Sequence, residues 1–250
     1  MKYISANDFE DKFEYAEGSS LRNNPNFVIV IDDNDRCFYF PKNFNTSVLE
    51  DINLAWFKQN NITFRRILDV GAGIGDDAAA LSEISNIIES FEIGQESFEC
   101  LVANLEIAAG TYAQGKIFNK HHVAITNSNN YSIEIAEYLN KPHLNKVAHL
   151  GDFFHERQYL VEEPTNYVLL KQSTIDNYNF QDVDFIKINV NGFELKVLEG
   201  AIETIKRCSP YIYVNLSEDQ LIRYSDSTKD VINLLNDLGY SKVSTNIFSK

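Results

Sequence analysis

The chain has 250 residues, 22 of them basic and 36 acidic, which gives a formal net charge of −14 at pH 7. This length suits one full α/β domain with a modest extension and is too short for two large domains. The negative charge repels phosphate backbones, so we expect no nucleic-acid substrate. The three cysteines match neither a disulfide framework nor a zinc-binding spacing. No segment resembles a signal peptide or a membrane span, and the sequence therefore predicts a cytoplasmic protein.

The first 60 residues differ in pattern from the rest of the chain. Runs typical of β-strands at 27–31 and 36–40 are joined by a polar Asp-Asp-Asn-Asp segment, which indicates a hairpin. Residues 46–59 then carry apolar side chains at helical spacing. We expect residues 1–60 to form a small cap of a hairpin and a helix, followed by the main domain at 61–250.

Strands and helices alternate along the main domain, which favours a mostly parallel, doubly wound α/β sheet with helices on both faces. The predicted helices cover residues 76–89, 95–109, 193–207 and 230–238. The predicted strands precede residue 71 and cover 90–93, 122–126, 132–135, 167–171, 183–190 and 211–216. The last ten residues suit one final antiparallel edge strand. The polar stretch between 151 and 164 has no clear periodicity, and insertions of this kind often build the substrate side of a site.

The most informative motif is ILDVGAGIGDD at residues 67–77, where an apolar strand leads through a glycine-rich turn into a helix. Glycines permit positive φ and close backbone approach, and the N–H groups of a helix start can bind a polar ligand. The spacing G-x-G-x-G differs from the dinucleotide fingerprint G-x-G-x-x-G, and Asp76 and Asp77 stand where a pyrophosphate needs positive potential. The motif therefore favours a cationic cofactor without phosphate. S-adenosylmethionine, which carries a sulfonium and an ammonium group, fits this description.

An acidic residue, Glu92, follows the glycines by about 20 residues at the tip of the next strand, where a carboxylate can accept both ribose hydroxyls. An NAD-dependent oxidoreductase would share this β-α-β unit and remains an alternative. The residues that we predict to bind the cofactor are Asp69, Gly71, Ala72, Gly73, Gly75, Asp76, Glu92, Ile93 and Ala124.

Four stretches of the chain, 67–77, 91–105, 122–126 and 173–201, resemble the FkbM family of S-adenosylmethionine-dependent methyltransferases. The last stretch is the most specific, because in that family a T-L-D segment precedes a strand that reads approximately D-F-I-K-I-D-V-E-G-x-E. The resemblance implies a Rossmann-like class I methyltransferase fold, with S-adenosylhomocysteine as the product. It also implies O-methylation, commonly of hydroxyls on sugars, glycans or glycosylated natural products.

The chain departs from the family pattern at the ends of two strands. Asn189 and Asn191 stand where the family usually has Asp and Glu, and Asn215 replaces an acid after the next strand. Only Glu194 of that acidic group remains. Because Asn cannot act as a general base and is a weak ligand for a hard cation, we expect no metal site. Two interpretations stay open: another residue supplies the base, or the domain binds its cofactor without turnover.

Lys187 and Asn189 alternate onto one strand face near the sheet edge that binds ligands in open α/β folds. We expect Asn189 to orient the cofactor or the acceptor hydroxyl. Burial of the Lys187 charge is costly unless it is paired. The sequence therefore leaves two roles open for Lys187, a structural ion pair with an acid such as Glu194 and a catalytic role. A histidine titrates in the range that a base requires. The further catalytic candidates are Glu194, His121, His122, Asp152 and His155.

Because the family resemblance implies carbohydrate hydroxyls, the acceptor that we expect is a neutral sugar within a carbohydrate or glycoconjugate. Neutral sugars bind to aromatic faces and hydrogen-bonding side chains. Aromatic residues available for this purpose in and near the irregular stretch are Phe153, Phe154, Tyr159 and Tyr178. The sequence leaves the oligomeric state open.

Overall fold

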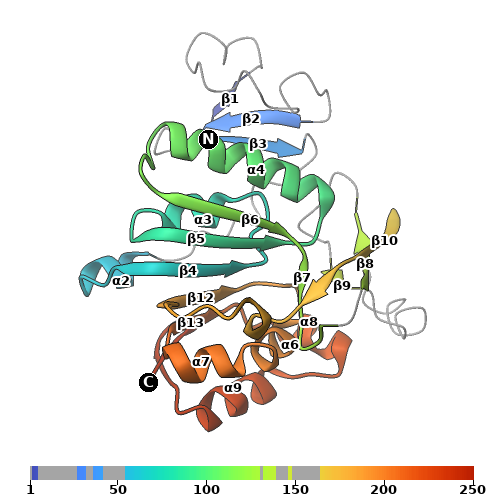
Figure 1. The fold of residues 1–250 in the computed structure, drawn as a ribbon. Helices are drawn as coiled ribbons and strands as arrows, with labels where there is room; N and C mark the ends of the chain where they lie inside the picture. The colour runs from blue at the N-terminus through green and yellow to red at the C-terminus, as the bar shows by residue number, and fades with distance from the viewer. Residues whose placement is uncertain are drawn as a thin grey trace.

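The computed structural model describes residues 2–4, 27–31, 36–41, 54–129, 132–138, 146–147 and 164–250. Within these residues the centre of the molecule is a seven-stranded sheet with the strand order β14-β15-β13-β12-β4-β5-β6 (Figure 1). Its strands are β4 (Phe64–Val70), β5 (Ser85–Glu92), β6 (Ile117–His122), β12 (Phe185–Ile188), β13 (Tyr211–Val214), β14 (Ser241–Ser244) and β15 (Ile247–Ser249). The pairs among β6, β5, β4, β12 and β13 are all parallel, and β15 is antiparallel to both of its neighbours. This arrangement confirms the predicted mostly parallel, doubly wound sheet.

Helices cover both faces of the sheet (Figure 1). On one face, α3 (Asp76–Leu81) and α4 (Gln95–Gly110) bury apolar side chains against the sheet. On the other face, α6 (Glu194–Glu199), α7 (Ile202–Cys208) and α9 (Thr228–Asp237) pack over β12 and β13. The shorter helices are α2 (Ala55–Gln59), α8 (Glu218–Leu221) and the 3₁₀ turns η5 (Asp176–Tyr178) and η6 (Ile222–Tyr224). No helix within the described residues is long and apolar enough to cross a membrane.

The N-terminal strands β1 (Lys2–Ile4), β2 (Phe27–Ile31) and β3 (Cys37–Pro41) form an antiparallel sheet, and β2 with β3 confirms the predicted hairpin. Strand β3 lies against α4 (Figure 1). The buried amide of Asn104 in α4 joins the two, because it accepts from Tyr39 N at 2.5 Å and donates to Tyr39 O at 3.1 Å. The same amide donates to Ile74 O at 2.8 Å and so also supports the glycine turn. Most of the predicted helix at 46–59 lies outside the described residues, and α2 is its last part.

In the described parts of the connection from β6 to β12 there are five short strands. They are β7 (Ala124–Ile125), β8 (Ile133–Glu137), β9 (Lys146–Val147), β10 (Asn166–Leu170) and β11 (Gln172–Ser173). Strands β10, β8 and β9 form an antiparallel sheet in that order, and β7 pairs in parallel with β11. We call β8, β9 and β10 the inserted sheet. It confirms the strands predicted at 132–135 and 167–171.

Two predicted boundaries in the first half of the domain are wrong. The helix predicted at 76–89 ends at Leu81, and β5 already begins at Ser85. The isoleucines at 84 and 88 fit a helical period, but β5 pairs with β4 from Ser85 onward. Both isoleucines are buried on the face of the sheet that α3 covers. The strand predicted at 122–126 is divided, because β6 ends at His122 and the short strand β7 covers Ala124–Ile125. The polar residues of β6 are tolerated because it is the edge strand.

Two further boundaries differ in the second half. The helix predicted at 193–207 is broken into α6 and α7 at Gly200, where a Cβ would lie 2.0 Å from the carbonyl oxygen of Thr126. The last ten residues form two strands, not one. The antiparallel strand is β15, and it lies between β13 and β14, so that β14 is the edge.

Candidate functional site

Two glycines of the turn between β4 and α3 have different surroundings. Gly71 has φ +76°, and a Cβ there would lie 1.9 Å from the backbone oxygen of Asn189 at the end of β12. Gly73 has φ +54°, and a Cβ there would have no heavy atom within 4 Å. The first glycine is thus required by the neighbouring strand, whereas the backbone of Gly73 borders open space. This space lies at the carboxyl edge of the sheet, where a cofactor is expected in this type of fold.

Lys187 lies beneath the turn and is almost completely buried. Its Nζ lies 2.9 Å from Asp69 Oδ1 and 3.0 Å from Asp77 Oδ2, and it donates to the carbonyl oxygen of Gly71 at 2.8 Å. The parallel register of β12 and β4 sets Lys187 opposite Asp69. The predicted alternative of a structural ion pair is therefore confirmed, but the expected partner, Glu194, is wrong. Lys187 connects β4, the turn and α3 at one point.

Glu92, at the end of β5, lies against the same turn. Its Oε2 accepts from Gly73 N at 2.8 Å and its Oε1 from Gly94 N at 2.8 Å. Burial raises the pKa of Glu92 to about 7, although the hydrogen bonds from these N–H groups favour the charged form. The structure therefore brings together the two parts of the predicted cofactor site, the glycines and the acid of the following strand.

Asp76 begins α3 directly after Gly75 and keeps part of its side chain exposed. Burial and the adjacent charge of Asp77 raise the pKa of Asp76 to about 7. Among the described residues, no ion pair joins Asp76 to a lysine, an arginine or a histidine. A cationic ligand in the turn would compensate its charge, which fits S-adenosylmethionine and opposes a pyrophosphate.

Apolar residues border the site on the side of the inserted sheet. Ile93 and Ala124, both predicted cofactor contacts, belong to one apolar cluster with Ile135 of β8. Phe193 and Tyr224 complete that cluster from the start of α6 and from η6. Ala72 is buried within the turn, and its N–H donates to Phe91 O at 3.0 Å.

Asparagines stand at the carboxyl ends of β12 and β13. Asn215 Nδ2 donates to Asn189 Oδ1 at 3.1 Å, so the two positions that carry acids in the family pattern form a neutral amide pair here. Asn191 has φ +56°, and its Oδ1 lies 3.5 Å from Gln220 Nε2. Glu194 is fully buried, and its Oε1 accepts from Val190 N at 3.1 Å and Gly192 N at 3.2 Å. Glu194 thereby holds the loop that carries Asn191.

The two histidines at the end of β6 have different surroundings. His122 Nε2 lies 3.0 Å from Ile93 O, and its ring stacks on Phe98 at 4.8 Å between ring centroids. His121 points to the other face of the sheet, where its Nε2 lies 2.9 Å from Glu89 Oε2. Of the two, only His122 contacts a predicted cofactor residue.

The remaining predicted residues either lie outside the described part of the chain or have other neighbours. Asp152, His155, Phe153, Phe154 and Tyr159 lie outside the described residues. Tyr178 packs against Phe91, His121 and Phe180, and it does not contact the asparagines in any described interaction. Within the described residues, no group of three or more His, Cys, Asp or Glu side chains is arranged to hold a metal ion.

Sequence reasoning missed one polar residue near the turn. Glu137 of β8 is buried, and its Oε1 accepts from Gln95 N at 3.2 Å at the start of α4. This contact joins the inserted sheet to the strand end that carries Glu92. No signal in the sequence points to it, because the two residues are 42 positions apart and β8 lies in an irregular stretch.

The sheet order, with one antiparallel strand next to the edge, and the glycine turn followed by an acid at the end of the next strand define a class I methyltransferase. S-adenosylmethionine is the cofactor of this class. The Methyltransferase FkbM domain matches residues 69–242, and the chain therefore belongs to the FkbM methyltransferase family. A search of curated proteins finds no match to the chain.

Solved structures with the same fold are distant in sequence. Methyltransferase FkbM from Methylobacillus flagellatus KT is 16% identical with a TM-score of 0.49, over 82% of this chain and 49% of that one. The present chain thus spans about half the length of that protein. TYW2 from M. jannaschii, solved in complex with AdoMet, is 10% identical with a TM-score of 0.42, over 89% of this chain and 82% of that one. Magnesium protoporphyrin IX methyltransferase from Synechocystis PCC 6803, solved with SAM, is 10% identical with a TM-score of 0.39, over 78% and 73%.

Proposed function

We propose that this methyltransferase transfers the methyl group of S-adenosylmethionine to a hydroxyl of a neutral sugar in a glycan or glycoconjugate. The observation that carries the proposal is the amide pair of Asn189 and Asn215 beside the glycine turn. Amide groups both donate and accept hydrogen bonds without bearing charge, which suits a neutral hydroxyl acceptor. The net charge of −14 disfavours nucleic acid at the same time.

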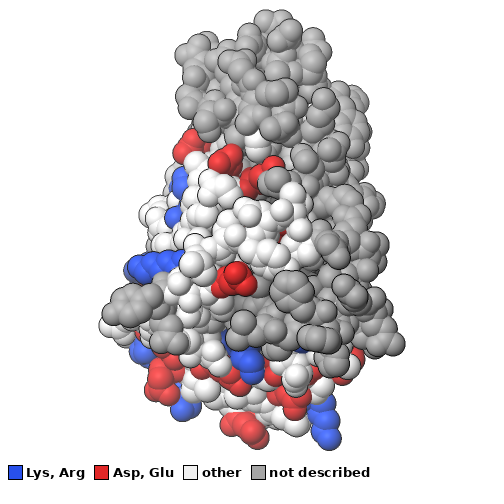
Figure 2. All heavy atoms as spheres, turned by 90° about the vertical axis from the view of Figure 1, so that its right-hand side faces the viewer, with Lys and Arg blue, Asp and Glu red and all other residues white. Residues whose placement is uncertain are grey.

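The surface at the carboxyl edge supports a neutral acceptor. Strands β4, β5 and β6 point toward the right-hand side of Figure 1, and Figure 2 shows the molecule from that side. Uncharged side chains make up much of the described surface in the middle of this view, whereas acidic and basic side chains alternate below. On this outer surface (Figure 2) a ligand meets few charged side chains among the described residues, and the carboxylates of Asp69, Asp77 and Glu92 at the strand ends are buried.

The chain's own residues would act mainly by positioning. A sulfonium is a good leaving group, so alignment of the acceptor oxygen with the methyl group supplies much of the rate. In this proposal Gly71, Gly73 and Glu92 hold the cofactor, and Lys187 keeps the turn in shape. Asn189 orients the acceptor hydroxyl.

The proton of that hydroxyl has to leave as the new bond forms, and a base assists this step. His122, Asp152 and His155 are the proposed bases, and among the described residues His122 contacts Ile93, a predicted cofactor residue. Glu194 supports the loop through its backbone hydrogen bonds. Because asparagines replace the usual acids, we expect methyl transfer to continue in excess EDTA.

The first experiment measures cofactor binding by isothermal titration with S-adenosylhomocysteine. Glu92→Ala should weaken binding by about 1–3 kcal/mol, because it removes a charged hydrogen-bond acceptor at the turn. Glu218→Ala, an exposed acid in α8, serves as the matched control and should leave the affinity unchanged. Unchanged affinity in Glu92→Ala would contradict the assignment of this acid to the cofactor.

The second experiment identifies the acceptor with labelled S-adenosylmethionine and a panel of neutral sugars, RNA, small phenols and proteins. We expect label on saccharides only, and loss of most transfer in Asn189→Ala with little change in cofactor affinity. Label on RNA or protein but on no saccharide would refute the glycan proposal.

A second candidate function is a cofactor-binding module without turnover. The three asparagines in place of the usual family acids favour it. Tight binding of S-adenosylhomocysteine together with no label on any acceptor would put this function first. Asn189→Asp and Asn215→Asp, which restore the family residues, would then be expected to restore transfer.

A further inference from the structure

The glycine turn holds more negative than positive charge. Four carboxyl groups, those of Asp69, Asp76, Asp77 and Glu92, surround it, and a single lysine, Lys187, interacts with all of them. The carboxyl groups come from three elements, β4, α3 and β5, and the lysine comes from β12. The excess of negative charge is therefore a fixed property of the fold at this point.

Lys187 compensates only part of this charge directly. Its ammonium donates to the carbonyl oxygen of Gly71 and lies within 3.0 Å of carboxylate oxygens of Asp69 and Asp77. Glu92 accepts from two backbone N–H groups. Asp76 differs from these carboxylates. Among the described residues, its side chain forms no ion pair and accepts no hydrogen bond from another residue.

The methyl donor and the product of the reaction differ by one charge. S-adenosylmethionine carries a sulfonium, an ammonium and a carboxylate, whereas S-adenosylhomocysteine carries a neutral thioether in place of the sulfonium. The adenosine and amino-acid parts are the same. A negative charge close to the turn therefore changes the affinity for the donor relative to the affinity for the product. Contacts to the shared parts change both affinities equally.

We propose that Asp76 is a specificity-determining residue that makes the site prefer the cationic methyl donor to the neutral product. This inference rests on the assignment of the cofactor to the glycine turn under the proposed function. At the effective dielectric of a partly buried site, one uncompensated carboxylate beside a bound cation would change the affinity ratio by about ten-fold. The product is then released more readily, and the donor displaces it.

Other charged groups around the turn set the background for this effect. Asp69, Asp77 and Lys187 form a closed ion cluster, and Glu92 faces Gly73 from β5. His122 contacts Ile93 O at the end of β6, and Glu137 of β8 contacts Gln95 N at the start of α4. Since burial raises the pKa of Glu92 to about 7 as well, a pH series alone does not isolate Asp76. An isosteric variant does.

The experiment measures dissociation constants by isothermal titration for S-adenosylmethionine, S-adenosylhomocysteine and sinefungin, which carries an ammonium in place of the methylsulfonium. In the wild-type protein at pH 8, the two cationic ligands should bind more tightly relative to S-adenosylhomocysteine than they do at pH 6. In Asp76→Asn the preference at pH 8 should fall about ten-fold, with the affinity for S-adenosylhomocysteine unchanged. The matched control, Asp237→Asn at the exposed end of α9, should keep the wild-type ratio.

Each outcome decides the question. If Asp76→Asn weakens all three ligands equally, or changes none, Asp76 does not discriminate by charge and the inference is wrong. If Asp76→Asn does not fold, Asp76→Ser takes its place, because it also removes the charge and is judged by the same affinity ratios. Gly73→Ala distinguishes failure of this inference from failure of the proposed function. If that variant binds every ligand as tightly as the wild type, the cofactor does not bind at the glycine turn and the proposed function is wrong.

Discussion

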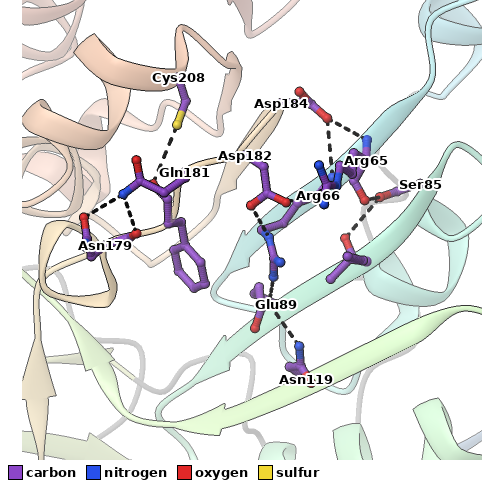
Figure 3. A network of polar contacts seen from close by, with 12 residues as sticks. Arg65, Arg66, Ser85, Glu89, Asn119, Asn179, Gln181, Asp182, Asp184 and Cys208 are labelled. Carbon is purple, nitrogen blue, oxygen red and sulfur yellow. Dashed lines mark hydrogen bonds and ion pairs between the residues drawn. The ribbon is translucent and has the colours of Figure 1, made fainter.

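Two charged networks brace the central sheet, and they differ in their access to water. The first is the cluster of Lys187, Asp69 and Asp77 under the glycine turn, in which the Lys187 side chain is 2% exposed and that of Asp69 is 0% exposed. The second joins Arg66 to Glu89 and Asp182 (Figure 3), and it continues to Arg65, whose side chain is 71% exposed. The first lies at the strand ends that carry the site, and the second lies on the face of β4, β5 and β6.

The two networks therefore have different sensitivity to the loss of one member. In the first, removal of the lysine leaves two buried carboxylates without a counter-charge, and water cannot replace it. In the second, Glu89 has two further partners besides Arg66. Asn119 Nδ2 donates to Glu89 Oε1 at 3.0 Å, and His121 Nε2 lies 2.9 Å from Glu89 Oε2. Solvent reaches Arg65 and parts of Arg66, Asp182 and His121, so the network can adjust.

The largest expected effect is that of Lys187→Met. It should lower the free energy of unfolding by about 3–5 kcal/mol, as is typical when one partner of a buried ion pair is removed. The measurement is urea denaturation at pH 7. Lys58→Met removes an exposed pair with Glu83 and is the matched control, with an expected loss below about 1 kcal/mol. Equal losses in the two variants would contradict the distinction between buried and exposed networks.

The next effect separates the two sides of the glycine turn. Gly71→Ala should destabilise the protein by more than about 2 kcal/mol, because φ +76° is unfavourable for alanine and its Cβ would collide with Asn189 O. Gly73→Ala has only the backbone cost of about 1–2 kcal/mol, since no atom lies within 4 Å of its Cβ. In denaturation, Gly71→Ala should therefore show the larger loss of stability. In titration with S-adenosylhomocysteine, Gly73→Ala should show the larger loss of affinity. A Gly73→Ala protein that is the less stable of the two would overturn this account of the turn.

The part of this molecule that could be predicted is the part whose residues are close in sequence. The glycine turn and Glu92 lie within one β-α-β unit, so strand, turn and acid follow from local pattern. The end of α3 was predicted wrongly, because isoleucines at 84 and 88 satisfy both a helical period and a buried strand. Short apolar segments do not distinguish these two structures.

The contacts between distant residues could not be predicted. Lys187 was expected to be paired, but its partner depends on the register of β12 against β4, which joins residues 118 positions apart. Glu137 reaches the start of α4 only because the inserted sheet folds back on the strand ends. The acceptor side of the site rests on such contacts and on an irregular stretch, whereas the cofactor side rests on a continuous motif.

A smaller effect distinguishes the carboxylates of the turn by their dependence on pH. The pKa of Asp76 is raised to about 7 from 3.8, so its charged form is disfavoured in the folded state. This unfavourable contribution is absent below about pH 4, grows as the pH rises to 7 and is complete above it. Asp76→Asn should therefore stabilise the cofactor-free protein at pH 8 by about 1–3 kcal/mol and have no effect at pH 4. Denaturation curves at the two pH values are the measurement, and equal effects would contradict it.

The smallest expected effect has the opposite sign and belongs to the second network. Burial by itself would raise the pKa of Glu89, but the hydrogen bonds from His121 and Asn119 and the charge of Arg66 outweigh it, so the pKa is lowered. A carboxyl with a lowered pKa stabilises the folded state above its unfolded pKa, and this stabilisation is lost as the pH falls through the folded pKa. Glu89→Gln should therefore be less stable than the wild type at pH 7, and the two should converge in acid. Because solvent screens part of the network, we expect a smaller difference than for Lys187→Met. A difference between Glu89→Gln and wild type that grows on acidification would show that Glu89 resembles the carboxylates of the turn, and the contrast between the two networks would no longer hold.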